Sequence, residues 1–374
     1  MLSGVLIVVA GTVATGAIDG GGFGRAESPT SVPAVVEGAT TSRSTPTADP
    51  GAAPAAEPAA ARQLTVIATG GADPGLPGDA AARLAPMRPF IAGFDLAICQ
   101  LTGPASDGFA AALAATGYDR CAVASPRAFT GGLDSIVSSI SALDAHRLGH
   151  SGIASDAVSS VPSVIEVNGI RVAHLSYTSG FDGPPPGAAV QSAVAVAAPE
   201  TVIADARAAR AAGAQAVMVS IDWGGSSGPA ATASDRLRAS ATIAASGAVD
   251  LILGSGGHAV APIQQIHGVW VAEDLGDSLA ASGSVDGIAL VCSIQSDTLG
   301  RITVQRPVAI PTHQSRGELG AVWPVWSTLA SRRTGSAAGG APSGPVPPAT
   351  ADLAASLART RQVVGSFIPA GDPS

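Results

Sequence analysis

The sequence predicts an α/β fold with mixed sheets, and three observations support this class. Short apolar runs alternate with helical segments along the middle of the chain, which is the pattern of strands paired in parallel across connecting helices. Asn168-Gly169 separates two runs rich in β-branched residues and predicts an antiparallel hairpin. Several apolar runs end in glycine and one polar residue, where α/β sheets usually place their chemistry.

Strands are predicted where short runs rich in Val, Ile, Leu and Ala are bounded by glycine, proline or polar residues. The first run ends at Gly70-Gly71, and the second ends at Thr102. The last predicted strand ends near Asp274. The predicted strands are residues 64–69, 95–101, 120–124, 163–167, 170–177, 217–221, 249–253 and 269–272.

Three helices are predicted from apolar spacing and from residues typical of helix ends. Residues 132–146 place apolar side chains on one face. Residues 199–212 begin at a proline and are followed by a glycine, and residues 235–246 are also followed by a glycine. These helices lie between predicted strands, which supports parallel pairing.

Composition argues against a dedicated nucleic-acid binder. The 374-residue chain has a net charge of −8, and all 20 basic residues are Arg because Lys is absent. The Arg residues form no cluster in the sequence, whereas nucleic-acid binding needs a basic surface. The chain is 46% hydrophobic but only 3% aromatic, so its core must be built from small and aliphatic side chains.

The chain divides into four predicted regions. Residues 1–26 contain an apolar, glycine-rich segment that predicts a secretory signal or a weak anchor, with an untargeted leader as the alternative. Residues 27–62 are rich in Ala, Pro and Thr and predict a disordered linker. Residues 63–331 form the predicted folded domain, and residues 332–374 a low-complexity tail with a short helix at 351–364.

Export bears on the three cysteines. The signal-like start predicts an extracytoplasmic protein, secreted or associated with the membrane or cell envelope. Cys99 and Cys121 lie in consecutive predicted strands and could form a disulfide in an exported protein. Buried free thiols are the alternative.

The order of several short motifs resembles the CapA family of poly-γ-glutamate and capsule synthesis proteins. The resemblance covers residues 64–279 and implies a metallophosphatase-like four-layer sandwich, in which two mixed β-sheets are flanked by helices. The matching motifs are Leu143-Asp144-Ala145, Val167-Asn168-Gly169, Tyr177-Thr178, Trp223-Gly224, Gly254, His258-Ala259-Val260 and Leu275-Gly276.

Most positions at which the resemblance implies metal-binding residues are changed. Asp222, His258 and Asp277 remain as candidate catalytic groups, and Asp222 and His258 as candidate metal ligands. A two-metal hydrolase needs a larger cluster of His and carboxylate groups. The sequence therefore predicts no cofactor, or at most one divalent ion such as Mn, Zn or Fe.

Four more residues are predicted to bind substrate. Arg127 stands where the resemblance implies a His, and a fixed cation there favours phosphate or carboxylate over a metal ion. The other three are Thr102, Ser255 and Trp223. The plainer alternatives are a surface charge for Arg127, a core position for Trp223, a loop residue for His258, and a cap or turn for Asp222 and Asp277.

The resemblance implies a cell-envelope protein that helps to make or handle an anionic polymer of the capsule or poly-γ-glutamate type. With a degenerate metal site, its role would be binding or assembly. Its expected partners are the polymer, or a phosphate or carboxylate ligand, and membrane proteins of capsule synthesis. The alternatives are a weak single-metal phosphoesterase using Asp222, His258 and Asp277, and a structural surface protein.

Overall fold

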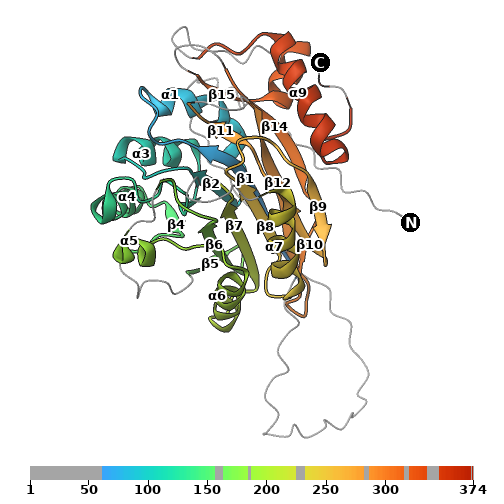
Figure 1. The fold of residues 1–374 in the computed structure, drawn as a ribbon. Coiled ribbons are helices and arrows are strands. Elements are labelled where there is room, and N and C mark those ends of the chain that lie inside the picture. The colour runs from blue at the N-terminus through green and yellow to red at the C-terminus, as the bar shows by residue number, and fades with distance from the viewer. Residues whose placement is uncertain are drawn as a thin grey trace, which may run out of the picture. The chain divides into compact units, whose positions relative to one another are not determined.

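The computed structural model describes residues 61–155, 163–183, 187–224, 232–281, 286–315, 320–334, 345–371 and 373. The predicted leader and nearly all of the predicted linker, residues 1–60, lie outside the described residues. Glu57–Ser374 form one compact unit, to which the following description applies. Two mixed sheets form its centre, with helices on their outer faces (Figure 1).

The first sheet has the strand order β15-β14-β12-β1-β2-β3-β4, with β11 paired to β1 and β13 paired to β12. Strands β1 to β4 run parallel, whereas β12 is antiparallel to β1. Its strands are β1 (Arg62–Ala72), β2 (Leu96–Leu101), β3 (Arg120–Ala122), β4 (Gly149–Ser151), β11 (Asp277–Leu279), β12 (Asp286–Ser296), β13 (Ile302–Val304), β14 (Val308–Gln314) and β15 (Val322–Pro324).

The second sheet has the order β5-β6-β7-β8-β10-β9. The predicted hairpin is confirmed, because β5 and β6 pair antiparallel around Asn168 and Gly169, whose φ angles are 49° and 75°. Both residues of this two-residue turn need positive φ, which Asn and Gly tolerate best. Its strands are β5 (Val164–Val167), β6 (Ile170–Thr178), β7 (Ala216–Asp222), β8 (Leu251–Ser255), β9 (Ile263–Ile266) and β10 (Val269–Ala272).

Helices α1 to α4 cover the outer face of the first sheet and α6 and α7 that of the second, whereas α8 and α9 pack against the core between the sheets. The three helices expected from spacing are α4, α6 and α7, each within a few residues of its predicted bounds. The helices are α1 (Ala80–Leu84), α2 (Arg88–Ile91), α3 (Asp107–Thr116), α4 (Gly132–Ala145), α5 (Ala188–Ala193), α6 (Pro199–Ala211), α7 (Ala233–Ala245), α8 (Val325–Arg333) and α9 (Thr350–Val364), with 3-10 turns η1 (Ala85–Met87) and η2 (Gly365–Phe367).

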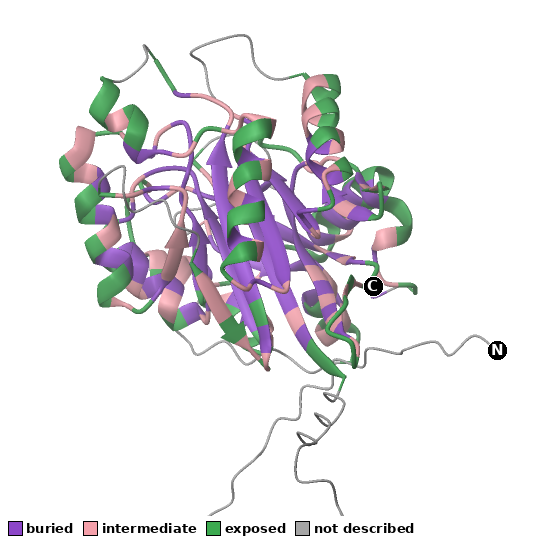
Figure 2. Ribbon diagram, turned by 90° about the horizontal axis from the view of Figure 1, so that it is seen from below, coloured by how far each residue is buried: buried purple, intermediate pink, exposed green. Residues whose placement is uncertain are grey.

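Three apolar cores lie between the layers. Strand β1 shows how alternation builds them, because Leu64 and Val66 face the second sheet whereas Ile67 faces the helices α1 to α4. A third core joins the second sheet to α6 and α7. The central strands are accordingly buried along most of their length (Figure 2). The predicted α/β class with two mixed sheets flanked by helices is confirmed.

The C-terminal segment contributes to the folded unit. The short helix expected near the end is present as α9, and its Leu353 is fully buried in the core between the sheets. Arg359 on this helix donates through Nε to the Asp286 carboxylate at 2.6 Å. The folded part of the chain therefore extends beyond the boundary predicted at Ser331.

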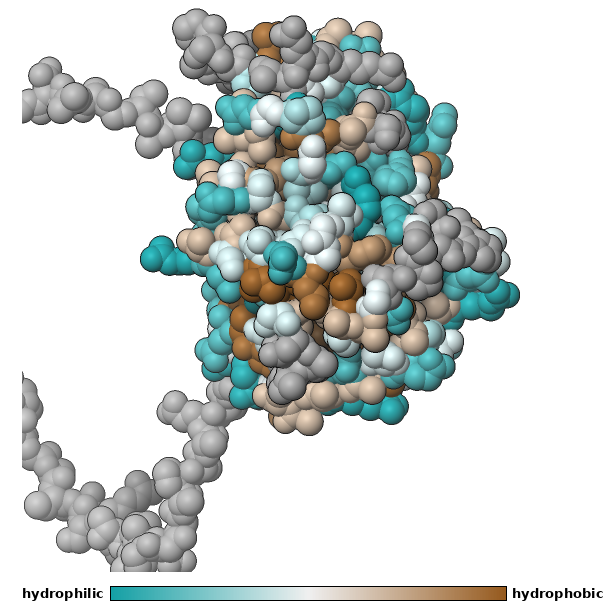
Figure 3. All heavy atoms as spheres, turned by 60° about the vertical axis from the view of Figure 1, so that its left-hand side comes forward, coloured by the Kyte–Doolittle hydropathy of each residue, from teal (hydrophilic) through white to brown (hydrophobic). Residues whose placement is uncertain are grey.

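The surface is mixed in character. On the face shown in Figure 3, hydrophobic residues gather in one small patch while most of the visible described surface is hydrophilic or intermediate. The large apolar side chains with substantial exposure include Leu299 and Val346, which lie in different parts of the sequence. Among the described residues, no helix has the length and apolarity needed to cross a membrane.

Candidate functional site

A polar cleft opens where several strands end. Its volume is about 660 Å³, and its walls come from the ends of β1, β2, β3, β6, β7 and β8 or the loops that follow them, from β11 and the residues after it, and from helix α7. Carboxyl ends of parallel strands are the usual ligand-binding edge of α/β sheets. The cleft is lined by Asp73, Thr102, Pro126, Arg127, Asp182, Asp222, Trp223, Gly224, Arg236, Gly256, Gly257, His258, Asp277, Leu279, Ala280 and Ala281.

Arg127 is fixed on one wall of the cleft. Its Nε donates to the Thr102 carbonyl at 3.0 Å, and Nη2 donates to Thr102 Oγ1 at 2.9 Å. Nη2 also lies 3.1 Å from Asp73 Oδ2, at the end of β1. With 42% of its side chain exposed, Arg127 keeps Nη1 without a partner among the described residues. The guanidinium is therefore oriented yet still able to donate.

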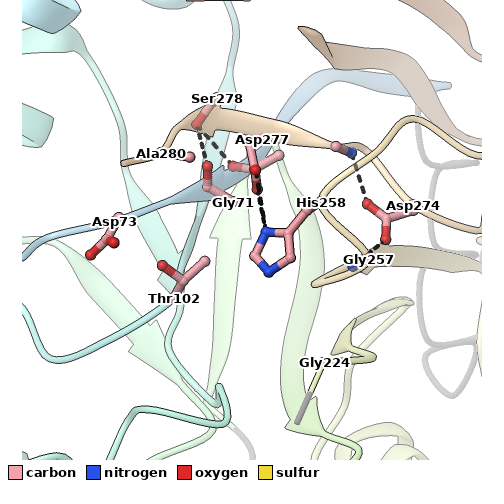
Figure 4. A network of polar contacts seen from close by, with 12 residues as sticks. Gly71, Asp73, Thr102, Gly224, Gly257, His258, Asp274, Asp277, Ser278 and Ala280 are labelled. Carbon is pink, nitrogen blue, oxygen red and sulfur yellow. Dashed lines mark hydrogen bonds and ion pairs between the residues drawn. The ribbon is translucent and has the colours of Figure 1, made fainter. Parts of the chain in front are cut away.

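His258 and Asp277 form an oriented pair. His258 Nδ1 lies 3.2 Å from both carboxylate oxygens of Asp277, and the two side chains point toward one another (Figure 4). Asp277 lies in strand β11, which is held to β1 by the Ser278 hydroxyl donating to the Gly70 and Gly71 carbonyls. The carboxylate raises the pKa of His258, although partial burial opposes the shift. Asp277 is thus a strand residue, not the turn residue that the sequence also allowed.

Asp222 lies at the end of β7 with only 6% of its surface exposed. Burial raises the pKa of its carboxyl group to about 7, with the neighbouring Asp274 adding to the shift and the Gly224 N–H and His258 opposing it. Asp222 Oδ1 accepts the Gly224 N–H at 2.9 Å. This carboxyl group therefore holds its proton over much of the acidic and neutral range.

Asp274, which follows β10, accepts a hydrogen bond from the loop that follows β8. Its two oxygens accept the N–H groups of Gly257 at 2.6 Å and Gly276 at 2.8 Å. Burial raises the pKa of Asp274 to about 6, although these N–H groups and Arg236 oppose the shift. Arg236 on α7 reaches the same carboxylate through Nη1 at 3.4 Å.

The glycine-rich loop makes room for these two carboxylates. A side chain at Gly256, where φ is 88°, would place its Cβ 2.0 Å from Asp222 Oδ1. A Cβ at Gly257 would lie 2.5 Å from Asp274 Oδ2. Real Cβ atoms do not approach oxygen so closely, so glycine is required at both positions. The Gly257 N–H that the loop could have offered to an external anion is already bonded to Asp274.

The structure brings most of the predicted site residues together. Six of the seven line the one cleft, namely Thr102, Arg127, Asp222, Trp223, His258 and Asp277. Trp223 lines the cleft and also belongs to the core that joins the second sheet to α6 and α7. Ser255 is the exception: it is only 1% exposed and does not line the cleft, because it is a paired residue of β8. Its predicted contact with substrate is therefore withdrawn.

The donor set does not fit a two-metal centre. Among the described residues, no group of three or more His, Cys, Asp or Glu side chains is placed to hold a metal ion. Asp222, His258 and Asp277 share the cleft, but His258 Nδ1 and Asp277 are engaged with each other. Two-metal catalysis needs several ligands around each ion.

Four charged residues near the cleft were not predicted. Asp73 was missed because β1 continues three residues beyond its predicted end at Thr69. Asp274 lies two residues after the end of the predicted strand 269–272. This position at a strand end could have indicated a site residue. Arg236 and Asp182 line the cleft from a helix and a loop, and their orientation leaves no pattern in the sequence.

The sequence profile of the bacterial capsule synthesis protein family (PGA_cap) matches residues 79–282, more than half of the chain. A search of curated proteins gave no match. Similar solved structures include a phosphatase from Mycoplasma pneumoniae, with 13% identity and a TM-score of 0.43, covering 67% of this chain and 93% of that chain.

Two nucleotidases are also similar in structure. The NAD nucleotidase NadN of Haemophilus influenzae has 10% identity and a TM-score of 0.44, covering 81% of this chain and 60% of that chain. The 5'-nucleotidase precursor of Thermus thermophilus has 13% identity and a TM-score of 0.43, covering 80% of this chain and 58% of that chain. This chain thus spans about three fifths of each nucleotidase.

Fold and cleft together define the class as a two-sheet α/β protein with a polar cleft at its strand ends. The family match is more specific than this class. The chain belongs to the bacterial capsule synthesis protein family. The predicted resemblance to capsule synthesis proteins is confirmed.

Proposed function

We propose that this member of the family binds an acidic cell-envelope polymer, of the capsule or poly-γ-glutamate type, in the cleft and without a two-metal centre. The observation that carries the proposal is the fixed guanidinium of Arg127, oriented by Thr102 and Asp73 with one nitrogen still available. Arg presents a planar set of donors that matches carboxylate and phosphate oxygens. Asp73 offsets part of the charge but leaves the donors in place.

Its role would be to hold the polymer or to assemble it with membrane proteins of capsule synthesis. An extracytoplasmic location fits this role and has one structural support. Cys99 and Cys121 are paired across β2 and β3 as a buried disulfide. Disulfides persist in oxidising compartments and are rare in the cytosol. The pairing that the sequence left open therefore favours an exported protein.

A weak single-metal phosphoesterase is the second candidate, because Asp222 and His258 line one cleft. The geometry favours the first candidate, since His258 Nδ1 and the Asp277 carboxylate are engaged with each other. Among the described residues, no group of three or more His, Cys, Asp or Glu side chains is placed to hold a metal ion. Metal content of the purified full chain, and hydrolysis of a generic phosphodiester with added Mn²⁺, separate the two. Stoichiometric metal with activity lost in His258→Ala would overturn our proposal.

Binding is tested by fluorescence anisotropy of labelled poly-γ-glutamate with the full chain in a chelator. We expect saturable binding that weakens by about tenfold or more in Arg127→Gln, because a charge-assisted hydrogen bond contributes about 1.5–3 kcal/mol. Arg238→Gln is the matched control, because Arg238 is 75% exposed and does not line the cleft. Equal affinities for wild type and Arg127→Gln would contradict the proposal.

A further inference from the structure

Arg236 is a second arginine in the cleft whose donors are mostly unused. It projects from the first turns of α7, with 19% of its side chain exposed. Its guanidinium makes one long contact, from Nη1 to Asp274 Oδ2 at 3.4 Å. Its Nε is buried and has no hydrogen-bond partner among the described residues. A guanidinium has five N–H donors, so most of its capacity is unassigned.

The unpaired Nε of the partly buried Arg236 is costly, and the surrounding structure keeps this side chain in place. Leaving a buried donor unpaired costs about 1–3 kcal/mol, and more when the group is charged. The surrounding sequence nevertheless keeps space for this side chain, because a Cβ at Gly257 would lie 2.8 Å from Arg236 Nη1. A site that accepts this cost in the free protein is expected to recover it when an acceptor binds.

The neighbouring Arg238 shows what an ordinary helix arginine does in the same segment. Arg238 is 75% exposed and pairs with Asp235 one helical turn earlier. Such surface pairs contribute little to stability and need no ligand. Arg236, two residues away, turns instead into the cleft, where its carboxylate partner Asp274 is almost completely buried.

The two cleft arginines belong to different walls. Arg127 is held by Thr102 and Asp73, at the ends of first-sheet strands, and Arg236 is held by Asp274, at the end of a second-sheet strand. Figure 4 shows Thr102 and Asp73 on one side of His258, with Asp274 and Gly257 on the other. A ligand that satisfies both guanidinium groups must therefore present acidic groups at two places.

We propose that Arg236 is a ligand-binding residue that takes a second acidic group, so that the cleft selects a chain of repeated carboxylates or phosphates over a single small anion. This inference rests on the proposed function and specifies its ligand class. Arg127 and Arg236 each contact one acidic group of the same chain, and the buried carboxylate of Asp274 orients the second guanidinium. Binding of the chain then gains from both contacts, whereas one small anion gains from one.

The test measures the affinity of the full chain for poly-γ-glutamate and for inorganic phosphate, in a chelator, for wild type, Arg236→Gln, Arg127→Gln and Arg238→Gln. We expect Arg236→Gln to weaken polymer binding by about tenfold or more, as expected for a lost charge-assisted contact. Phosphate binding should fall by less, and Arg236→Lys should restore part of the polymer affinity. A purely structural role would lower the melting temperature without changing the ratio of the two affinities.

Two outcomes distinguish a failure of this inference from a failure of the proposed function. If Arg127→Gln loses polymer binding while Arg236→Gln behaves like Arg238→Gln, the second contact is wrong and the proposed function stands. If wild type shows no saturable polymer binding, both are wrong. Equal losses of polymer and phosphate binding in Arg236→Gln would overturn the selection of a chain over a small anion.

Discussion

Replacing Asp222 by Asn should stabilise the protein above neutral pH. The carboxyl group is 6% exposed, and burial raises its pKa from the ordinary value of 3.8 to about 7. Between these values the folded state holds a proton that the unfolded state has lost. The contribution of this group to stability is therefore fully present below about pH 4 and is lost as the pH rises through 7.

The magnitude follows from the size of the shift. A displacement of about 3 pH units corresponds to about 4 kcal/mol at 1.36 kcal/mol per unit. The amide of Asn is neutral at every pH and can still accept the Gly224 N–H through Oδ1. We therefore expect Asp222→Asn to match wild type near pH 4 and to gain up to about 4 kcal/mol in free energy of unfolding at pH 8.

The assay is urea unfolding of the full chain in a chelator at pH 4, 6 and 8, followed by tryptophan fluorescence. Asp274→Asn is the matched contrast, because both Asp274 oxygens accept N–H groups and one also contacts Arg236. An amide offers one acceptor oxygen where the carboxylate offers two, so Asp274→Asn should lose an N–H hydrogen bond at every pH. Because burial raises the pKa of Asp274 only to about 6, the gain in stability from pH 4 to pH 8 should be smaller for Asp274→Asn than for Asp222→Asn.

A stability difference between wild type and Asp222→Asn that does not grow from pH 4 to pH 8 would show that burial does not raise the pKa of Asp222. A repeat with excess Mn²⁺ tests the metal alternative. If the ion binds the ionised carboxylate of Asp222, wild type should gain stability that Asp222→Asn lacks. We expect no such difference.

Three further predictions concern the frame around the cleft. Gly256→Ala places a methyl group 2.0 Å from Asp222 Oδ1 and should lower the free energy of unfolding by about 2–4 kcal/mol, measured by urea titration. Reduction of the Cys99–Cys121 disulfide, whose partners are 22 residues apart in sequence, should cost about 3 kcal/mol, seen as a lower melting temperature in reducing buffer and a mass change after alkylation. Leu353→Ala should cost about 2–5 kcal/mol, because the side chain is fully buried, and no loss of stability would show that α9 does not dock.

Much of the fold could be predicted because local chemistry and tertiary packing agree. The Asn168-Gly169 hairpin needs only two residues with positive φ, and both strands were found. Helix α6 was found from its starting proline and its following glycine. Strands β12 and β14 extend the first sheet on the far side of β1 from β2. They lie after the last predicted strand, 269–272, and were not predicted.

The site was predicted only in part, for a different reason. Residues at strand ends, such as Thr102 and Asp222, could be placed in one cleft because the carboxyl ends of parallel strands meet. Arg236 could not, because a helix pattern does not say which side chain bends toward a neighbouring loop. The glycines before His258 provide the space in which the Asp222 and Asp274 carboxylates lie, a role that follows only from the tertiary structure.

The most direct test of the central claim is the affinity of the full chain for poly-γ-glutamate, measured by calorimetry in a chelator and again with excess Mn²⁺. We predict saturable binding of equal strength in both buffers, with a loss of about tenfold or more in Arg127→Gln but not in Arg238→Gln. Binding that requires Mn²⁺ and survives in Arg127→Gln would show that the polymer is held through a metal ion and not through Arg127.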